Sequence, residues 1–285
     1  MLERILVPLD GSPAGARILE VVRPLARRAH GKAILFHAAE PPLASGMNSG
    51  FVGQDIRLDA EKYLEGVVRE LKPEGFHAEI LVRVGPAAGV ILDGIKETKA
   101  TLVAMATHGR TGLARLAFGS VAEQVLHASH VPVLLLRSVE GTPPHGSGDK
   151  NVWSQVLVPV DGSELALGVA SRVAEIAKAC GSRVILIHVL PPEPARSESL
   201  EHADAIFAAA KKAFEAAGVK VEDTMIRTGD AASEILDACR QRPIAAIAIS
   251  SHGRSGLARL VMGSVAENVV RGSWLPVLVA RSFKK

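Results

Sequence analysis

The stretch ILVPLDGS at residues 5–12 returns almost unchanged as VLVPVDGS at residues 156–163. Each copy runs through aliphatic residues, broken only by one proline, until it reaches Asp-Gly-Ser. A short run of this kind is typical of a strand that is covered on both faces. Ser12 followed by Pro13 is a good N-cap and first-turn pair, so a helix is expected to begin directly after the turn. The stretch therefore predicts a buried strand joined to a helix, and this unit occurs twice in the chain.

Other blocks of the sequence repeat as well. AILFHAAEPP at 33–42 returns as VILIHVLPPE at 184–193, and more than half of the aligned residues in 106–137 and 250–281 are identical. Repetition on this scale indicates a duplicated structural unit.

The segment SVEGTPPHGSGDKN at 138–151 separates the two copies. It replaces apolar periodicity with Gly, Pro, Ser and charge, which is typical of a linker. We therefore expect a first domain at 1–138, a linker at 139–152 and a second domain at 153–285.

Within each copy, strand and helix patterns alternate along the chain. This order predicts an α/β fold, with a five-stranded parallel sheet, helices on both faces and right-handed crossovers. In the first copy the expected strands are 4–9, 32–38, 78–84, 100–106 and 131–137, and the expected helices are 13–30, 56–72, 86–97 and 119–128.

Composition narrows the classes of protein. The 285 residues are 48% hydrophobic and 22% charged, with a net charge of +3, which is typical of a globular protein without a basic nucleic-acid face. Aromatic residues make up only 4%, which disfavours stacking on single-stranded nucleic acid. The two cysteines, the lack of a signal-peptide pattern and the absence of a spanning apolar run predict a cytoplasmic protein with no nucleic-acid or membrane partner.

A glycine-rich phrase, THGRTGLARLAFGS at 107–120, returns as SHGRSGLARLVMGS at 251–264. It lies between the fourth strand and the last helix of each copy, where parallel α/β sheets bind ligands. Gly119 and Ser120 open that helix, whose first amides and positive dipole end suit an anion. Gly109 and Gly112 permit the preceding loop to fold over such an anion, and Arg110 or Arg115 could add charge.

Several of these residues also have structural explanations. Ser120 with Glu123, and Ser264 with Glu267, match the S-x-x-E capping box. Asp10 and Asp161 favour an Asx turn in Asp-Gly-Ser, and His37 and His188 are read mainly as strand-end histidines bonded to the backbone. His127 and His130 correspond to Arg271 and Trp274, so a shared metal site is not expected, and no catalytic residues are predicted.

Three features together resemble the universal stress protein family: V-P-x-D-G-S after the first strand, an apolar residue and His at the end of the second (Phe36-His37 and Ile187-His188), and T/S-H-G-x9-G-S after the fourth. The resemblance covers nearly the whole chain, twice. It implies a tandem member with the adenine nucleotide alpha hydrolase-like fold and strand order 3-2-1-4-5 in each copy. The ATP-binding members of the family carry G-x2-G-x9-G-[ST]. The last two glycines are present in both copies, whereas Ala106 and Ser250 stand at the first glycine and depart from the pattern.

The same resemblance implies a ligand and its contacts. Asp10 and Asp161 would lie near the ribose or adenine, and Ala38 and Val189 would offer backbone contacts to adenine. The ligand would be ATP, ADP or AMP, bound with or without Mg2+. The remaining cofactor-binding positions are Ala106, His108, Gly109, Arg110, Gly119, Ser120 and Val121 in the first copy and Ser250, His252, Gly253, Arg254, Gly263, Ser264 and Val265 in the second.

Two classes of function follow from these observations. One is a stress-response regulatory or signalling protein that binds adenine nucleotide, and the alternative is a nucleotide-free interaction protein with the same fold. Slow ATP hydrolysis is a weaker hypothesis, because no general base or metal-ligand set stands out. The family commonly dimerises through its last strand, so residues 131–137 and 275–281 are expected to pair within one molecule, and a homodimer of such chains is a further expectation.

Overall fold

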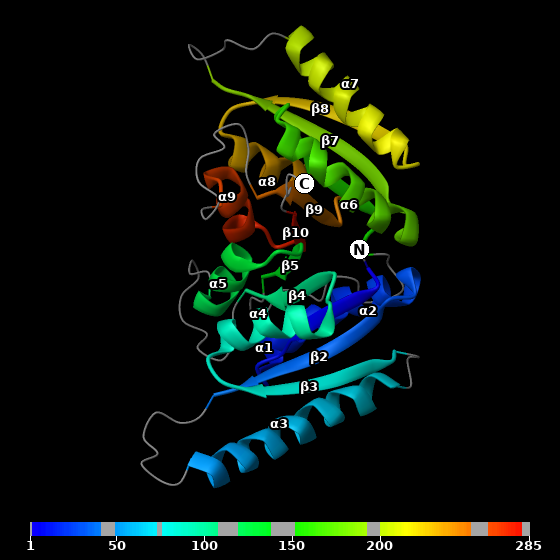
Figure 1. Cartoon of the computed structure of the whole chain (residues 1–285). Coiled ribbons are helices and arrows are strands. Elements are labelled where there is room, and N and C mark those ends of the chain that lie inside the picture. The colour runs from blue at the N-terminus through cyan, green and yellow to red at the C-terminus, as the bar shows by residue number, and fades with distance from the viewer. Residues whose placement is uncertain are drawn as a thin grey trace. The chain divides into compact units, whose positions relative to one another are not determined.

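The computed structural model describes residues 2–40, 49–72, 76–107, 119–137, 152–192, 200–251 and 262–280. The chain divides into two compact units, residues 1–142 and 143–285, which are described one at a time (Figure 1).

The first unit is built on parallel strands in the order β3-β2-β1-β4-β5. This order confirms the prediction, and the reversal of direction after β1 leaves a switch point between β1 and β4. The strands are β1 (Arg4–Pro8), β2 (Lys32–Ala39), β3 (Ala78–Val84), β4 (Leu102–Ala106) and β5 (Val133–Leu136).

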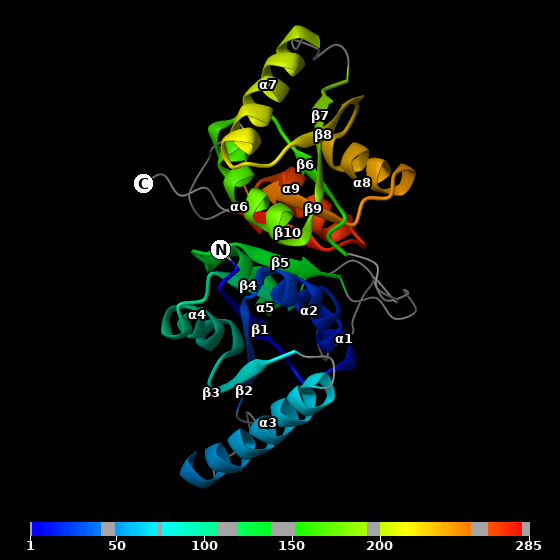
Figure 2. The same cartoon turned by 90° about the vertical axis from the view of Figure 1, so that its right-hand side faces the viewer.

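Helices cover both faces of the first sheet (Figure 2). α1, α2 and α3 pack on one face, and α4 and α5 pack together on the other. The helices are α1 (Pro13–Ala16), α2 (Ile18–Ala29), α3 (Ser49–Leu71), α4 (Ala87–Thr98) and α5 (Ser120–Ala128).

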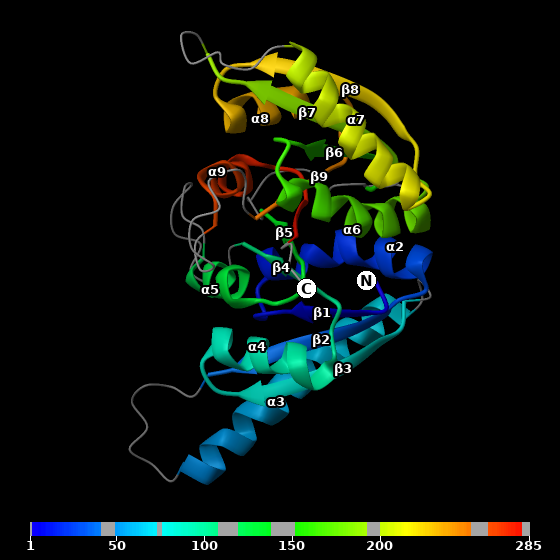
Figure 3. The ribbon, with the colours of Figure 1, turned by 45° about the horizontal axis from the view of Figure 1, so that its top comes forward.

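The second unit repeats this arrangement as β8-β7-β6-β9-β10, again with parallel strands. α6 and α7 lie side by side on one face (Figure 3), and α8 and α9 pack together on the other. The strands are β6 (Gln155–Pro159), β7 (Arg183–Leu190), β8 (Val221–Thr228), β9 (Ala246–Ser250) and β10 (Val277–Ala280), and the helices are α6 (Glu164–Cys180), α7 (Leu200–Ala216), α8 (Ala231–Gln241) and α9 (Ser264–Gly272).

The opening stretch behaves as its sequence predicts. Ile5, Leu6 and Val7 of β1 are fully buried, as expected for a strand covered on both faces. Ser12 is the N-cap of α1 and accepts a hydrogen bond from the Gly15 amide at 2.9 Å. The predicted helix at 13–30 is instead two helices, α1 and α2, joined at Arg17, and α3 begins at Ser49, seven residues before the predicted start at 56.

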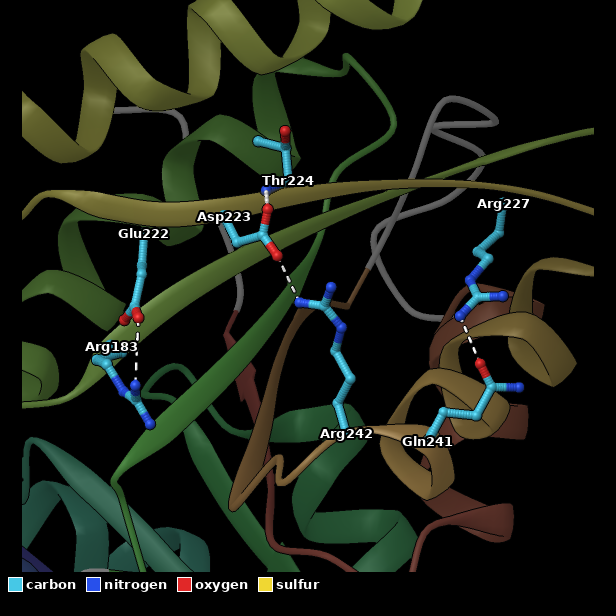
Figure 4. Close-up of polar contacts among 7 residues, drawn as sticks. All are labelled: Arg183, Glu222, Asp223, Thr224, Arg227, Gln241 and Arg242. Carbon is cyan, nitrogen blue, oxygen red and sulfur yellow. Dashed lines mark hydrogen bonds and ion pairs between the residues drawn. The ribbon is translucent and has the colours of Figure 1, made fainter.

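Charged side chains line β8, which ends the strand order of its unit (Figure 4). Arg183 of β7 pairs with Glu222 at 3.2 Å, and Arg242, just after α8, pairs with Asp223. Arg227 donates to the side-chain oxygen of Gln241 at 2.6 Å. The Arg242 hydrogen bond, with that of the Thr224 amide, holds the pKa of Asp223 below its usual value. Charge along an edge strand discourages pairing with other chains.

Among the residues that the structure describes, no helix is long and apolar enough to cross a membrane.

Candidate functional site

A cavity of about 630 Å³ opens in the second unit at the carboxyl ends of β6, β7 and β9. It lies at the switch point of the sheet, between β6 and β9, and is bounded by the first residues of α8 and α9. Its walls are mostly aliphatic. It is lined by Pro159, Val160, Asp161, Ala166, Ile187, His188, Val189, Pro191, Pro192, Gly229, Asp230, Ala231, Ile235, Ile249, Ser250, Ser251, Gly263, Ser264, Val265 and Ala266.

This cavity brings together residues that are far apart in the sequence but were all expected to contribute to one site. They come from the ends of three strands and from the start of α9. The predicted residues that line the cavity are Asp161, Val189, Ser250, Gly263, Ser264 and Val265.

Asp161 is held by the turn that follows β6. Its Oδ1 atom accepts hydrogen bonds from the Ser163 amide at 3.0 Å and the Ser163 hydroxyl at 2.7 Å. The Ser163 hydroxyl oxygen in turn accepts from the Ala166 amide at 3.1 Å and caps α6. Gly162 makes this turn possible with φ +82°, a conformation that favours glycine. The Asx turn is therefore present, and it fixes the carboxylate at the cavity wall.

Val189 presents backbone groups to the same space. The Ile187 carbonyl accepts from the Val160 amide at 2.9 Å, and the Leu190 carbonyl accepts from the Gly229 amide at 3.0 Å, on the β8 side. Successive residues of a strand direct their backbone groups to opposite sides. Val189 therefore directs its N–H and C=O to the β6 side, beyond the point where β6 ends. The N–H can donate and the C=O can accept a hydrogen bond at the polar edge of a flat ring.

The start of α9 differs from the predicted capping box. Gly263, not Ser264, is the N-cap, and no side chain caps the helix, because Ser264 is already its first residue. Glu267 instead pairs with Arg271 at 2.8 Å. The first-turn amides of α9 are thus not occupied by a side-chain cap, which favours an anion at this helix end.

Gly263 has φ −65°, and Gly119 at the start of α5 has φ −64°. Both glycines therefore have ordinary extended backbone that any residue can adopt. The Gly263 amide donates to the Ser251 carbonyl at 2.8 Å, and the Gly119 amide donates to Thr107 at 2.9 Å. The glycines therefore anchor the helix start to the end of the fourth strand.

Asp230 lines the cavity but was not predicted. It is the N-cap of α8, and its Oδ1 accepts from the Ser233 amide at 3.0 Å and the Ser233 hydroxyl at 2.7 Å. These hydrogen bonds lower the pKa of its carboxyl, so the group is ionised at neutral pH. The sequence signal was Gly229-Asp230 before a helical pattern, which predicts a helix cap but does not predict that the cap lines the same cavity as Asp161.

The first unit holds the corresponding residues at the same ends of its strands. Asp10 accepts from the Ser12 amide at 3.0 Å and the Ser12 hydroxyl at 2.7 Å, in the same turn. Ala38 lies in β2, and Ala106 is the last residue of β4. Ser120 and Val121 begin α5, again with no side-chain cap.

Eight of the predicted residues lie outside the described part of the chain. They are His108, Gly109, Arg110, Gly112, Arg115, His252, Gly253 and Arg254.

The expected backbone bond of the strand-end histidine is seen in the second unit. His188 is buried, and its Nδ1 lies 2.7 Å from the Val160 carbonyl oxygen, which confirms its predicted bond to the backbone. His37 is also buried and meets Tyr63 edge-on, with ring centroids 5.8 Å apart. Among the described residues, no group of three or more His, Cys, Asp or Glu side chains could hold a metal ion.

A family model described as the universal stress protein family matches residues 1–137 and again 153–281. The chain belongs to this family. The two matches make it a tandem universal stress protein, as the internal repeat predicts.

Individual members of the family resemble the chain over one repeat or over both. A universal stress protein of Methanocaldococcus jannaschii is 31% identical over 148 residues, which cover 48% of this chain and 86% of that protein. A universal stress protein of Mycobacterium tuberculosis is 29% identical over 301 residues, covering 97% of this chain and 96% of that protein. A crystal structure of a universal stress protein from Archaeoglobus fulgidus covers 99% of both chains with a TM-score of 0.78 at 22% identity, which shows the shared fold.

Proposed function

We propose that this universal stress protein binds an adenine nucleotide in the cavity of its second unit and acts as a regulatory or signalling protein in the stress response. The observation that carries the proposal is the meeting of Asp161, Val189 and the start of α9 around one cavity. Its volume of about 630 Å³ falls within the range of about 300–1,000 Å³ that is usual for small-molecule sites.

The chemistry of the cavity suits the three parts of a nucleotide. Aliphatic walls that include Val160, Ile187 and Ile235 suit a flat apolar base. The Asp161 carboxylate is an acceptor for sugar hydroxyls, which donate hydrogen bonds. The uncapped amides at the start of α9 suit the phosphates. ATP, ADP and AMP share all three parts, and Mg2+ would accompany the phosphates of ATP or ADP.

The nucleotide would act by changing the relative populations of two conformations of the protein. A ligand that binds one conformation of the protein more tightly than another favours that conformation, and it changes partner binding only as far as the two conformations differ. Regulation of a partner is therefore proposed in place of turnover.

Titration calorimetry of the full chain with ATP, ADP and AMP, with and without Mg2+, tests the proposal. Binding of at least one nucleotide is expected. If none binds at millimolar concentration, the protein is instead an interaction protein that keeps the fold without a nucleotide. An absorbance spectrum of the purified protein gives an independent result, since co-purified nucleotide raises absorbance near 260 nm above that expected from two Trp and one Tyr.

A further inference from the structure

The two units share one backbone frame around the region that corresponds to the cavity. In the second unit the Gly229 amide donates to the Leu190 carbonyl at 3.0 Å, and in the first the Gly85 amide donates to Ala39 at the same distance. In the second unit this bond joins the end of β7 to the turn before α8. In the first unit it joins the end of β2 to the turn before α4. The side chains that follow these strands can therefore be compared directly.

The side chain that follows this frame differs between the units. In the first unit Glu40 follows Ala39, and its Oε1 atom accepts a hydrogen bond from the Ala87 amide, the first residue of α4, at 2.8 Å. The side chain thus spans from the end of β2 to the start of α4. In the second unit the corresponding residue is Pro191, which has no polar side-chain atom and lines the cavity.

The helix starts are capped in matching but different ways. Asp230 caps α8 locally, through Ser233, three residues along its own helix. In the first unit Pro86 precedes α4 and provides no side-chain cap, so the Ala87 amide takes its partner from Glu40. The local cap leaves the space between β7 and α8 within the cavity. In the first unit the exposed Glu40 side chain instead bridges from the end of β2 to the start of α4.

Another difference between the units does not have this effect. Phe36 stands where the second unit has Ile187, but its ring is directed at α4: a Cβ added to Gly94 would lie 2.8 Å from its Cε2 atom. The extra volume of Phe36 is thus accommodated by a glycine in the helix. The difference that bears on the site is therefore the partner of the helix start, which is Glu40 from the end of β2 in the first unit and the local cap Asp230 in the second.

We propose that the two repeats bind nucleotide unequally, with the tight site in the second repeat and with the Glu40 bridge to Ala87 opposing entry of a base in the first. The inference rests on the proposed function, because it says which repeat carries it. A base entering the first repeat would have to displace the carboxylate from the Ala87 amide and would meet a charged group where the second repeat offers Pro191. Both effects weaken binding of an apolar ring.

A matched pair of variants of the full chain locates the tight site. Gly119→Val and Gly263→Val place the same side chain at the start of α5 or α9, where the ordinary φ of both glycines accepts it without backbone strain. In calorimetry with ATP, wild type is expected to show one tight site, Gly119→Val to keep it and Gly263→Val to lose it. Circular dichroism establishes that each variant is folded.

A reciprocal exchange tests the role of Glu40 and does not depend on the glycine variants. Pro191→Glu in the wild-type chain is expected to weaken the tight site at least about tenfold, the scale of a competing charged hydrogen bond. Glu40→Ala in the Gly263→Val chain is expected to strengthen the first site by about the same factor. Two equal sites in wild type, loss of the tight site in Gly119→Val, or no change in Pro191→Glu would each overturn the inference and leave the proposed function standing. Absence of any binding by wild type at millimolar nucleotide would overturn both.

Discussion

The Nδ1 atom of His188 lies 2.7 Å from the carbonyl oxygen of Val160, and this contact joins β7 to the end of β6 one residue before Asp161. A carbonyl oxygen only accepts, so Nδ1 carries the hydrogen in this contact. His188 is 2% exposed, and its ring also meets Phe207 edge-on. The histidine therefore fixes the backbone of Val160, from which the Asp161-Gly162-Ser163 turn of the candidate site begins.

Replacing His188 with Phe keeps a ring of similar bulk but removes the donor to Val160. Leaving a buried carbonyl without its partner is expected to cost about 1–3 kcal/mol of stability, measured by urea unfolding. His130→Phe is the control, since His130 is exposed and its replacement should leave the free energy of unfolding nearly unchanged. Equal stability of His188→Phe and wild type would show that the contact contributes little.

Two substitutions at Asp161 separate its structural role from its proposed contact with nucleotide. Asn keeps an oxygen for the Ser163 amide, so Asp161→Asn should retain the turn and the stability, whereas Asp161→Ala should lose both. Because the second carboxylate oxygen becomes a donor group, Asp161→Asn is expected to weaken nucleotide binding by about 1–3 kcal/mol in calorimetry. Wild-type affinity in Asp161→Asn would assign the residue to the turn alone.

Gly162 is predicted to be the costly glycine of the Asp-Gly-Ser turn. Its φ is +82°, so Gly162→Ala is expected to destabilise the protein by about 1–2 kcal/mol. Gly89→Ala is the matched contrast, because Gly89 lies inside α4 with nothing within 4 Å of an added Cβ, and there alanine should stabilise the helix by up to about 1 kcal/mol. Chemical unfolding followed by circular dichroism should give opposite signs for the two variants.

The two cysteines, Cys180 and Cys239, are expected to be unreactive in the folded protein. Both are buried, and burial raises the pKa of the Cys239 thiol to about 12. Because the folded pKa lies above the unfolded one, the stability linked to this thiol is present below about pH 8.5 and is lost as pH rises toward the folded pKa. A colorimetric thiol reagent at pH 8 should find no fast-reacting thiol in native protein and two after unfolding in guanidinium. Rapid labelling of the native protein would contradict the predicted burial.

The pairing of residues 131–137 with 275–281 within one molecule stays a prediction from the sequence. Paired strands would hold the two units at one fixed separation, so spin labels placed one on each unit should give a single narrow distance distribution. A broad distribution, as expected for a flexible tether, would refute it. Molecular mass in solution tests the further expectation of a homodimer.

Much of the fold could be predicted because it depends on short sequence patterns that occur in both repeats. The aliphatic run of 5–9 predicts a covered strand, and the strand order follows from the family resemblance that Asp-Gly-Ser and the glycine-rich phrase carry. The early start of α3 at Ser49 was not predictable, since SGFVGQ has little helical pattern and gains a helix only by continuing α3. The predicted capping boxes failed for a related reason: S-x-x-E is equally compatible with Ser264 as first helical residue, and the bond from Gly263 to Ser251 decides between the two.

The sequence by itself determined the duplication, the alternation of parallel strands and helices, the Asx turn at Asp161 and the strand ends at which a ligand is expected. The duplication is seen by comparing the two halves of the sequence, and the other features depend on residues and their near neighbours along the chain. The tertiary structure alone decided which side chains share a space: Asp230 lines the same cavity as the ends of β6 and β9, and Glu40 accepts from the amide of Ala87 in the first unit where the second has Pro191. Contacts of this kind join residues separated by whole strands and helices, and their geometry is set by the packing of the sheet and not by any local pattern.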